Sequence, residues 1–221
     1  MSLEGARPEV FGNGGATILL SVGDGVERSG LRDEWVLPHE LTHLGFPSVP
    51  SRHTWIEEGL ATYVEPIARA ERGELTDEEV WIQLVRGLPQ GLPEEGDRGL
   101  DQTHTWGRTY WGGALFCLVA DVAIRERTSN RKGLVDALRA IVAAGGNVSV
   151  RWPLERALAV GDRAVGVPVL GELYRKMGAA PMSVHLDDLW RRLGVRRRGR
   201  GVSFDDAAPL AAVRRAMISR R

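Results

Sequence analysis

The chain has 221 residues, which is long enough for one domain with a substantial core. Its composition, with 43% hydrophobic and 26% charged residues, is typical of a soluble globular protein. Because 29 Lys and Arg balance 29 Asp and Glu, no global field would attract nucleic acid or an acidic membrane, and we expect no nucleic-acid partner. No segment has the roughly 18 unbroken apolar residues of a membrane helix.

The N-terminal part is expected to contain one strand before the first helix. Residues 4–16 are rich in glycine and predict a loop, whereas the apolar run at 17–22 predicts a short strand. A turn at 23–30 follows, and an apolar pattern around Trp35 then leads into a helix. Pro38 requires this helix to begin near Trp35 or to bend directly after the proline. The first residues lack the pattern of a signal peptide, and an upstream segment could be missing, so the compartment stays open.

The predicted helix contains the sequence HELTH and ends at Gly45. His39 and His43 are four residues apart, so their imidazoles leave one face of the helix and can bind one cation. Glu40 can then reach a water on that metal and take its proton, which makes zinc-dependent hydrolysis the chemistry that the motif favours. The alternative is that both histidines simply lie on the surface of an ordinary helix.

A second helix, predicted to start at Thr54 with the sequence TWIEEGLATY, offers the third ligand. Thr54 and Glu57 have the spacing of a capping box, which would turn Glu57 back onto the helix start. Glu58 is therefore the expected ligand. The site predicted from these two helices holds one Zn²⁺ through His39, His43 and Glu58.

The middle of the chain predicts a short helix, a long loop and a buried helix. Thr76 and Glu79 form a capping box, and 87–102 is a loop that fits either a rim or lid or a mobile connection. Residues 106–124 form the most apolar helix, in which a close approach to another helix would explain Gly112 and Gly113. Within this run, Asp121 is expected at the solvated edge of the helix and Cys117 in the core.

The C-terminal part predicts further helices at 134–144, 153–160, 167–177, 186–193 and 209–218, with a strand at 202–204. The arginine cluster at 191–200 has no interleaved aromatic residues, so it favours a solvated face over a nucleic-acid site. The fold class is mainly α, with a small strand region. We expect one catalytic domain in two lobes, residues 1–72 with the zinc-binding helices and residues 73–221 as a helical lobe.

Taken together, HELTH, WIEEGLATY and TYWGGALFCLVADVAIRERT resemble the gluzincin zinc metallopeptidases. The chain is most similar to the glycyl aminopeptidase family and more distantly to the aminopeptidase N type. This resemblance covers about residues 14–145 and implies a thermolysin-like catalytic domain that acts on a peptide or protein substrate. It implies His39, His43 and Glu58 as zinc ligands, Glu40 as general base and Tyr110 as a donor that stabilises the transition state.

The resemblance has two departures that bear on function. Tyr110-Trp-Gly-Gly-Ala114 matches a YxKGA segment of the family, but Gly112 replaces its lysine. Gly15-Ala-Thr-Ile-Leu19 lacks the glutamate with which the aminopeptidase N type reads a free amino terminus, so aminopeptidase specificity is not supported. Helical spacing alone would make Tyr110 a packing residue of the buried stripe, whereas the YxKGA match favours a catalytic role.

Three functions are compatible with these motifs. The first is a zinc-dependent peptidase that hydrolyses peptide bonds with a metal-activated water. The second is an inactive, peptidase-like binding or structural module, whose signature would have been a lost general base, and Glu40 is present. The third is a zinc hydrolase for a substrate other than a peptide, because the metal chemistry would be the same.

Overall fold

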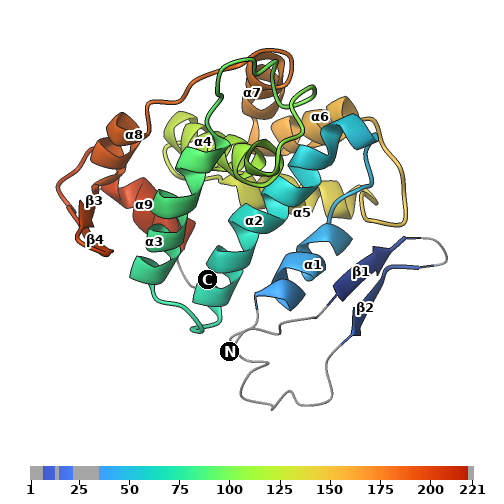
Figure 1. Ribbon diagram of the computed structural model, residues 1–221, viewed down its shortest axis with the longest axis horizontal. Helices are drawn as coiled ribbons and strands as arrows, with labels where there is room; N and C mark the ends of the chain where they lie inside the picture. The colour runs from blue at the N-terminus through green and yellow to red at the C-terminus, as the bar shows by residue number, and fades with distance from the viewer. Residues whose placement is uncertain (1–6, 13–14, 22–34, 219–221) are drawn as a thin grey trace.

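The computed structural model describes residues 7–12, 15–21 and 35–218, and helices dominate this part of the chain (Figure 1). The helices are α1 (Val36–Leu44), α2 (Thr54–Glu71), α3 (Asp77–Gly87), α4 (Gly113–Arg127), α5 (Leu134–Ala143), α6 (Leu154–Val165), α7 (Val169–Met177), α8 (Leu186–Leu193) and α9 (Ala211–Met217). The mainly helical class predicted from the sequence is confirmed. No helix in the described ranges is long and apolar enough to cross a membrane.

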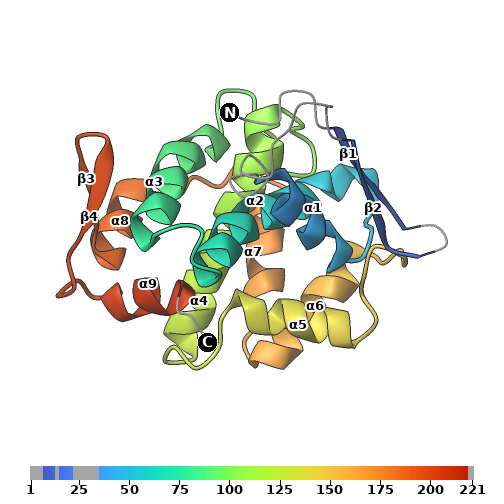
Figure 2. The same ribbon diagram turned by 90° about the horizontal axis from the view of Figure 1, so that it is seen from below.

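Three short helical turns and two antiparallel hairpins complete the described structure. The turns are two 3₁₀ segments and one π-helical segment, Ser51–His53, Leu88–Gly91 and Arg108–Gly112. The hairpins pair β1 (Arg7–Phe11) with β2 (Thr17–Ser21) and β3 (Val195–Arg198) with β4 (Gly201–Phe204). The two hairpins lie at opposite ends of the molecule in both views (Figures 1 and 2).

The core is built around α2 and α4, which run through the middle of the molecule (Figure 2). Trp55, Leu60 and Tyr63 are buried on α2, as their helical spacing predicts, and Cys117 is buried on α4. Buried residues from Phe46 to Ile218 join one continuous cluster, so α2, the loop before it and the later helices share a core. The division at residues 72 and 73 into two lobes stays a prediction.

The glycines of α2 and α4 bring the two backbones into direct contact. A Cβ atom on Gly113 would lie 1.9 Å from the carbonyl oxygen of Trp55, and one on Gly59 would lie 2.3 Å from Cα of Gly113. These distances exclude any side chain at either position. The expected close helix approach is therefore present at Gly113, with Gly59 as the partner residue, whereas a Cβ atom on Gly112 would lie nearest the side chain of Leu100, at 2.8 Å, rather than the backbone of α2.

Several local signals produce the elements that the sequence predicts. Thr76 caps α3 by accepting a bond from the backbone N–H of Glu79 at 3.2 Å, while the Glu79 carboxylate accepts one from the Thr76 N–H at 2.7 Å. Gly194 ends α8 in the left-handed conformation at φ 72°. The predicted turn at 23–30 and residue 22 of the first predicted strand lie outside the described residues.

Two strands were missed. β1 lies within residues 4–16, which the glycine and proline content assigned to a loop. Among the described residues it pairs with β2 alone, so it is an edge strand there and tolerates Pro8. β3 lies in the arginine cluster, where Val195 is buried and Arg196, Arg197 and Arg198 are exposed. The expected solvation of the arginines is confirmed, but their backbone pairs with β4.

The loop at 87–102 is attached to the core by buried polar contacts. Asp97 forms an ion pair with Arg108 at 2.7 Å, and both side chains are buried. Asp101 accepts hydrogen bonds from Trp55 Nε1 at 2.8 Å and from the Tyr174 hydroxyl at 2.9 Å, and it lies 2.7 Å from His53 Nδ1. These contacts tie the loop to α2 and α7, which does not fit a mobile connection.

The placement of Asp121 on the solvated edge of its helix is wrong. The residue is 4% exposed and sits between three elements. Its carboxylate accepts hydrogen bonds from the Tyr63 hydroxyl on α2 at 2.9 Å, from Arg125 Nε at 2.9 Å and from the backbone N–H of Leu134 at 2.8 Å. Three donors, one of them the charged guanidinium of Arg125, compensate for the lost hydration, which periodicity alone does not reveal.

Asp121 is therefore expected to be a large contributor to stability. Asp121→Ala would leave Arg125 and two further donors buried without their acceptor, so it should lower the free energy of unfolding by about 3–5 kcal/mol. Urea unfolding measures the change. Asp188→Ala, which removes an exposed ion pair with Arg191, is the matched control and should cost less than about 1 kcal/mol. Equal losses in the two variants would contradict a buried network at Asp121.

Candidate metal centre

The two histidines of the HELTH sequence are presented by the first two turns of α1. The helix starts at Val36, with Pro38 in its first turn, where the missing N–H has no helical partner to lose. The His39 N–H donates to the carbonyl of Trp35 at 3.1 Å, so the helix is intact at the motif. The rings of His39 and His43 are stacked edge to face with centroids 5.1 Å apart, on the one face predicted from their spacing.

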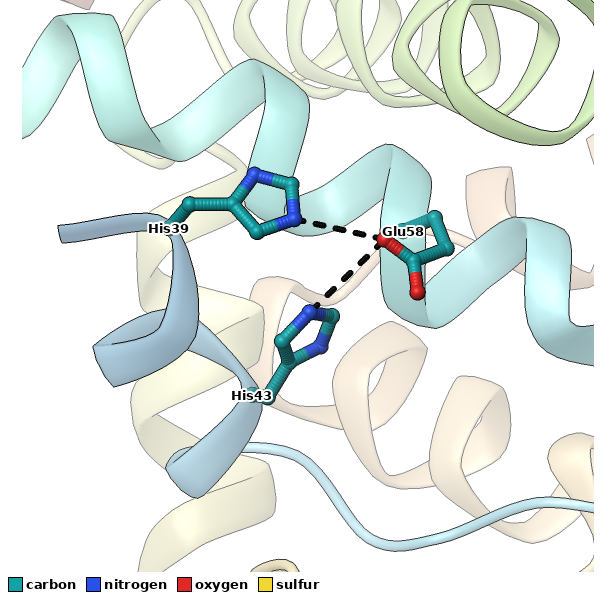
Figure 3. Close-up of side chains that lie close together, drawn as sticks. All are labelled: His39, His43 and Glu58. Carbon is teal, nitrogen blue, oxygen red and sulfur yellow. Dashed lines mark hydrogen bonds and ion pairs between the residues drawn. The ribbon is translucent and has the colours of Figure 1, made fainter. Parts of the chain in front are cut away.

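Glu58 on α2 completes a group of three potential ligands (Figure 3). Its Oε2 lies 3.2 Å from Nε2 of His39 and 3.8 Å from Nε2 of His43. One ligand atom from each of the three residues lies within 4.8 Å of the other two. The structure thus brings together the three side chains that the sequence names as metal ligands.

This donor set fits a zinc ion. Two imidazole nitrogens and one carboxylate oxygen are the ligands of many catalytic zinc sites, and tetrahedral zinc at 2.0–2.2 Å requires neighbouring ligands about 3.3–3.5 Å apart. The two measured separations, 3.2 and 3.8 Å, bracket that value. Burial of His43 lowers its pKa more than the negative charge of Glu58 raises it, which favours the neutral imidazole that binds metal.

Of the two adjacent glutamates, Glu58 lies beside the histidines and Glu57 does not, but the local reason differs from the capping box expected from the sequence. The helix cap is His53 rather than Thr54, and the Thr54 hydroxyl donates to the carbonyl of Ser51 at 2.7 Å. Glu57 accepts a hydrogen bond at 2.9 Å from the backbone N–H of Val49. No capping box forms because the 3₁₀ turn before α2 moves the cap by one residue, yet Glu57 still turns toward the start of the helix.

Glu40 lines a pocket of about 280 Å³ together with His43 and Glu58. Partial burial raises the pKa of Glu40; the positive charge of His39 opposes this, and the negative charge of Glu58 adds to it. A raised pKa makes a carboxylate a better proton acceptor, although a cation in the site would pull the value back. Glu40 thus lies on the wall of the same pocket as two of the three candidate ligands.

Tyr110 approaches the cluster from the π-helical turn that precedes α4. Its ring is stacked on His39 with centroids 6.3 Å apart, and it lies close enough to Glu58 to sense the charge of that carboxylate. Burial and the negative charge of Glu58 raise the pKa of Tyr110, so the phenol keeps its proton. A protonated hydroxyl beside the cluster can donate to an oxyanion.

Two features of this region were not predicted. The π-helical turn, Arg108–Gly112, interrupts the run read as one continuous α-helix, and π turns occur frequently at functional sites. Trp35 packs edge-on against His39 with centroids 5.6 Å apart, and Trp106 is stacked on Tyr110 at 5.5 Å. The signal for the aromatic neighbours was the position of each tryptophan four residues before a proposed site residue.

No family model matches the chain, and no curated protein and no solved structure matches it. The resemblance to gluzincins therefore rests on its motifs, and membership of that family stays a prediction.

We expect substitution of Glu58, but not of the adjacent Glu57, to cause loss of the metal. Glu58→Gln should weaken zinc binding at least about 100-fold, because it replaces a ligand carboxylate with a neutral amide. Glu57→Gln should leave it unchanged, because the amide oxygen can still accept from Val49. Elemental analysis and competition with a chromophoric chelator measure both. Zinc retained by Glu58→Gln and lost by Glu57→Gln would reverse the assignment.

Proposed function

We propose that the protein is a zinc-dependent peptidase of the gluzincin type, with a thermolysin-like catalytic domain. The observation that carries the proposal is the convergence of His39, His43 and Glu58 from two helices onto a space no wider than 4.8 Å. Two further groups that hydrolysis needs lie next to this space. Glu40 lines the same pocket as Glu58, and Tyr110 is close enough to Glu58 to sense its charge.

Each residue has a distinct role in this proposal. His39, His43 and Glu58 hold the zinc, which when bound polarises a carbonyl group and lowers the pKa of water. Glu40 accepts the proton of the attacking water and returns it to the leaving amine. The C–N bond breaks, the acyl carbon gains the hydroxyl group, and the amine gains the proton. Tyr110 donates a hydrogen bond from its O–H to the carbonyl oxygen, which becomes negatively charged when water adds to the carbonyl carbon.

The expectation of a thermolysin-like domain belongs to the same proposal. α1 with the HELTH sequence packs on α2 with WIEEGLATY, and α4 crosses α2 next to Glu58. The two histidines thus lie on α1, the glutamate on α2 and the tyrosine on the π-helical turn before α4, which supports the proposal. Function is argued from these side chains because a fold alone does not fix an activity.

A peptide library incubated with the purified protein tests the proposal. New amino termini should appear in mass spectra, disappear after zinc removal and return when zinc is added back. Zinc binding without cleavage of any peptide would support a binding module instead. Cleavage of ester substrates with every peptide left intact would support the hydrolase acting on another substrate.

Glu40→Gln should abolish turnover and keep the zinc. The amide has nearly the same shape but cannot accept the proton of the water, so the loss should appear in kcat at unchanged metal content. Initial rates on a cleaved library peptide and elemental analysis of the same sample provide both values. Loss of zinc in this variant would instead indicate that Glu40 is a ligand.

Tyr110→Phe should lower kcat roughly 10²–10³-fold with zinc retained, because one donor to the oxyanion is removed. The ring and its stacking on His39 stay, so the Michaelis constant should change less than kcat. Steady-state kinetics on the same peptide measure both parameters. Unchanged turnover would return Tyr110 to the packing role that its helical spacing allows.

A further inference from the structure

A second pocket borders the ligand cluster at His39 and shares no lining residue with the pocket of Glu40. Its volume is about 480 Å³, and its walls are largely aromatic. Trp35, Trp106, Tyr110 and Trp111 line it, together with His39. Since His39 and Tyr110 also border the cluster, the pocket is adjacent to the place where a substrate carbonyl would react.

The aromatic walls of this pocket are held by specific contacts. Trp106 is stacked on Tyr110 with the rings 27° from parallel, and Trp35 meets His39 edge-on. The ring of Trp111 lies directly over Gly87, where an added Cβ would be 2.0 Å from it. The pocket is therefore shaped in advance of any ligand, which lowers the entropic cost of binding.

The exposure of two of these rings needs a reason. All seven tryptophans lie in the described part of the chain, and only Trp35 and Trp106, at 51% and 61% exposed, are classed as exposed. Both line the same pocket. Isolated exposed apolar residues are ordinary, but two exposed indoles that face one cavity beside a candidate active site point to a ligand with an apolar ring.

The charged residues of the pocket do not favour an ionic ligand. Glu65 and Arg69 lie in its lining, both are buried, and they pair with each other at 3.0 Å. By contrast, Glu40 and Glu57 line the smaller and more polar pocket at His43 and Glu58. The two pockets thus differ in chemistry, and the aromatic pocket suits an uncharged ring.

We propose that this pocket binds the aromatic side chain of a peptide, at a residue next to the bond that is cleaved. The cleavage part rests on the proposed peptidase function, whereas ring binding does not. An aromatic ring would stack in offset or edge-on geometry on Trp106 and Trp35, an interaction that an aliphatic side chain of similar area lacks. With its ring held there, the backbone of that residue would lie at His39 and Tyr110.

The first experiment measures binding without turnover. N-acetyl-phenylalaninamide, N-acetyl-leucinamide and N-acetyl-alaninamide are titrated into the purified protein and followed by tryptophan fluorescence and by NMR shifts of the indole N–H groups. The phenylalanine compound should bind roughly tenfold more tightly than either of the others. Equal affinity for leucine and phenylalanine would overturn the aromatic assignment, and no binding of the phenylalanine compound would overturn the pocket.

Variants locate the effect. Trp106→Ala should weaken binding of the phenylalanine compound roughly tenfold, whereas Trp106→Phe should retain most of it because a ring remains. Trp106 is exposed, so neither change should prevent folding. Val142→Ala, at an exposed position on α5 outside the lining, is the control. Unchanged binding by Trp106→Ala would contradict the proposal.

The second experiment reads the sequences cleaved from a peptide library. An aromatic residue should recur at one fixed position beside the cut, and Trp106→Ala should remove that preference while cleavage of alanine-containing peptides continues. Cleavage with no aromatic preference would overturn the pocket and leave the peptidase proposal standing. Ring binding with no cleavage would overturn both the peptidase proposal and the placement of the ring beside a cleaved bond.

Discussion

The direct contact between the backbones of α2 and α4 is the constraint on which the candidate site depends. Gly59 follows Glu58, and Gly113 lies three residues after Tyr110, so the point at which the two helices touch is adjacent in sequence to both groups. Larger side chains at this contact would hold the helix axes about 8–10 Å apart, and the turn with Tyr110 would then lie farther from Glu58. Because glycine has no side chain, these two residues allow the contact that positions the site. Each lowers helix stability by about 1 kcal/mol relative to alanine.

Two carboxylates, each with several hydrogen-bond donors, stabilise the rest of this framework. Asp121 joins α2, α4 and the start of α5, and Asp101 joins α2, α7 and the loop after α3. Each accepts bonds from side chains or N–H groups of separate segments, so each fixes several segments in one arrangement. These networks hold α2 along its length while its outward face presents Glu58. A rigid scaffold behind a small set of functional groups is what preorganised chemistry requires.

Sequence patterns within single segments predicted most of the features that depend on interactions within those segments. Helix periodicity, capping residues and terminal glycines identified the helices, and the four-residue spacing of His39 and His43 placed both rings on one face. What sequence reasoning missed depends on partners distant in the chain. β1 forms because β2 pairs with it, Asp121 is buried because Tyr63 and Leu134 satisfy it, and the cap of α2 moves because a 3₁₀ turn precedes it. A pattern within one segment contains no information about such partners.

The π-helical turn at Arg108–Gly112 makes the orientation of Tyr110 a matter of residue count as well as residue identity. A π turn closes through i→i+5 bonds and so holds one residue more than an α turn. Deleting a single residue there would restore i→i+4 bonding and rotate everything before it by about 100° relative to α4. The side chain of Tyr110 would then point in a different direction. A protein with the same motif but a different number of residues in this turn would therefore not have the same site.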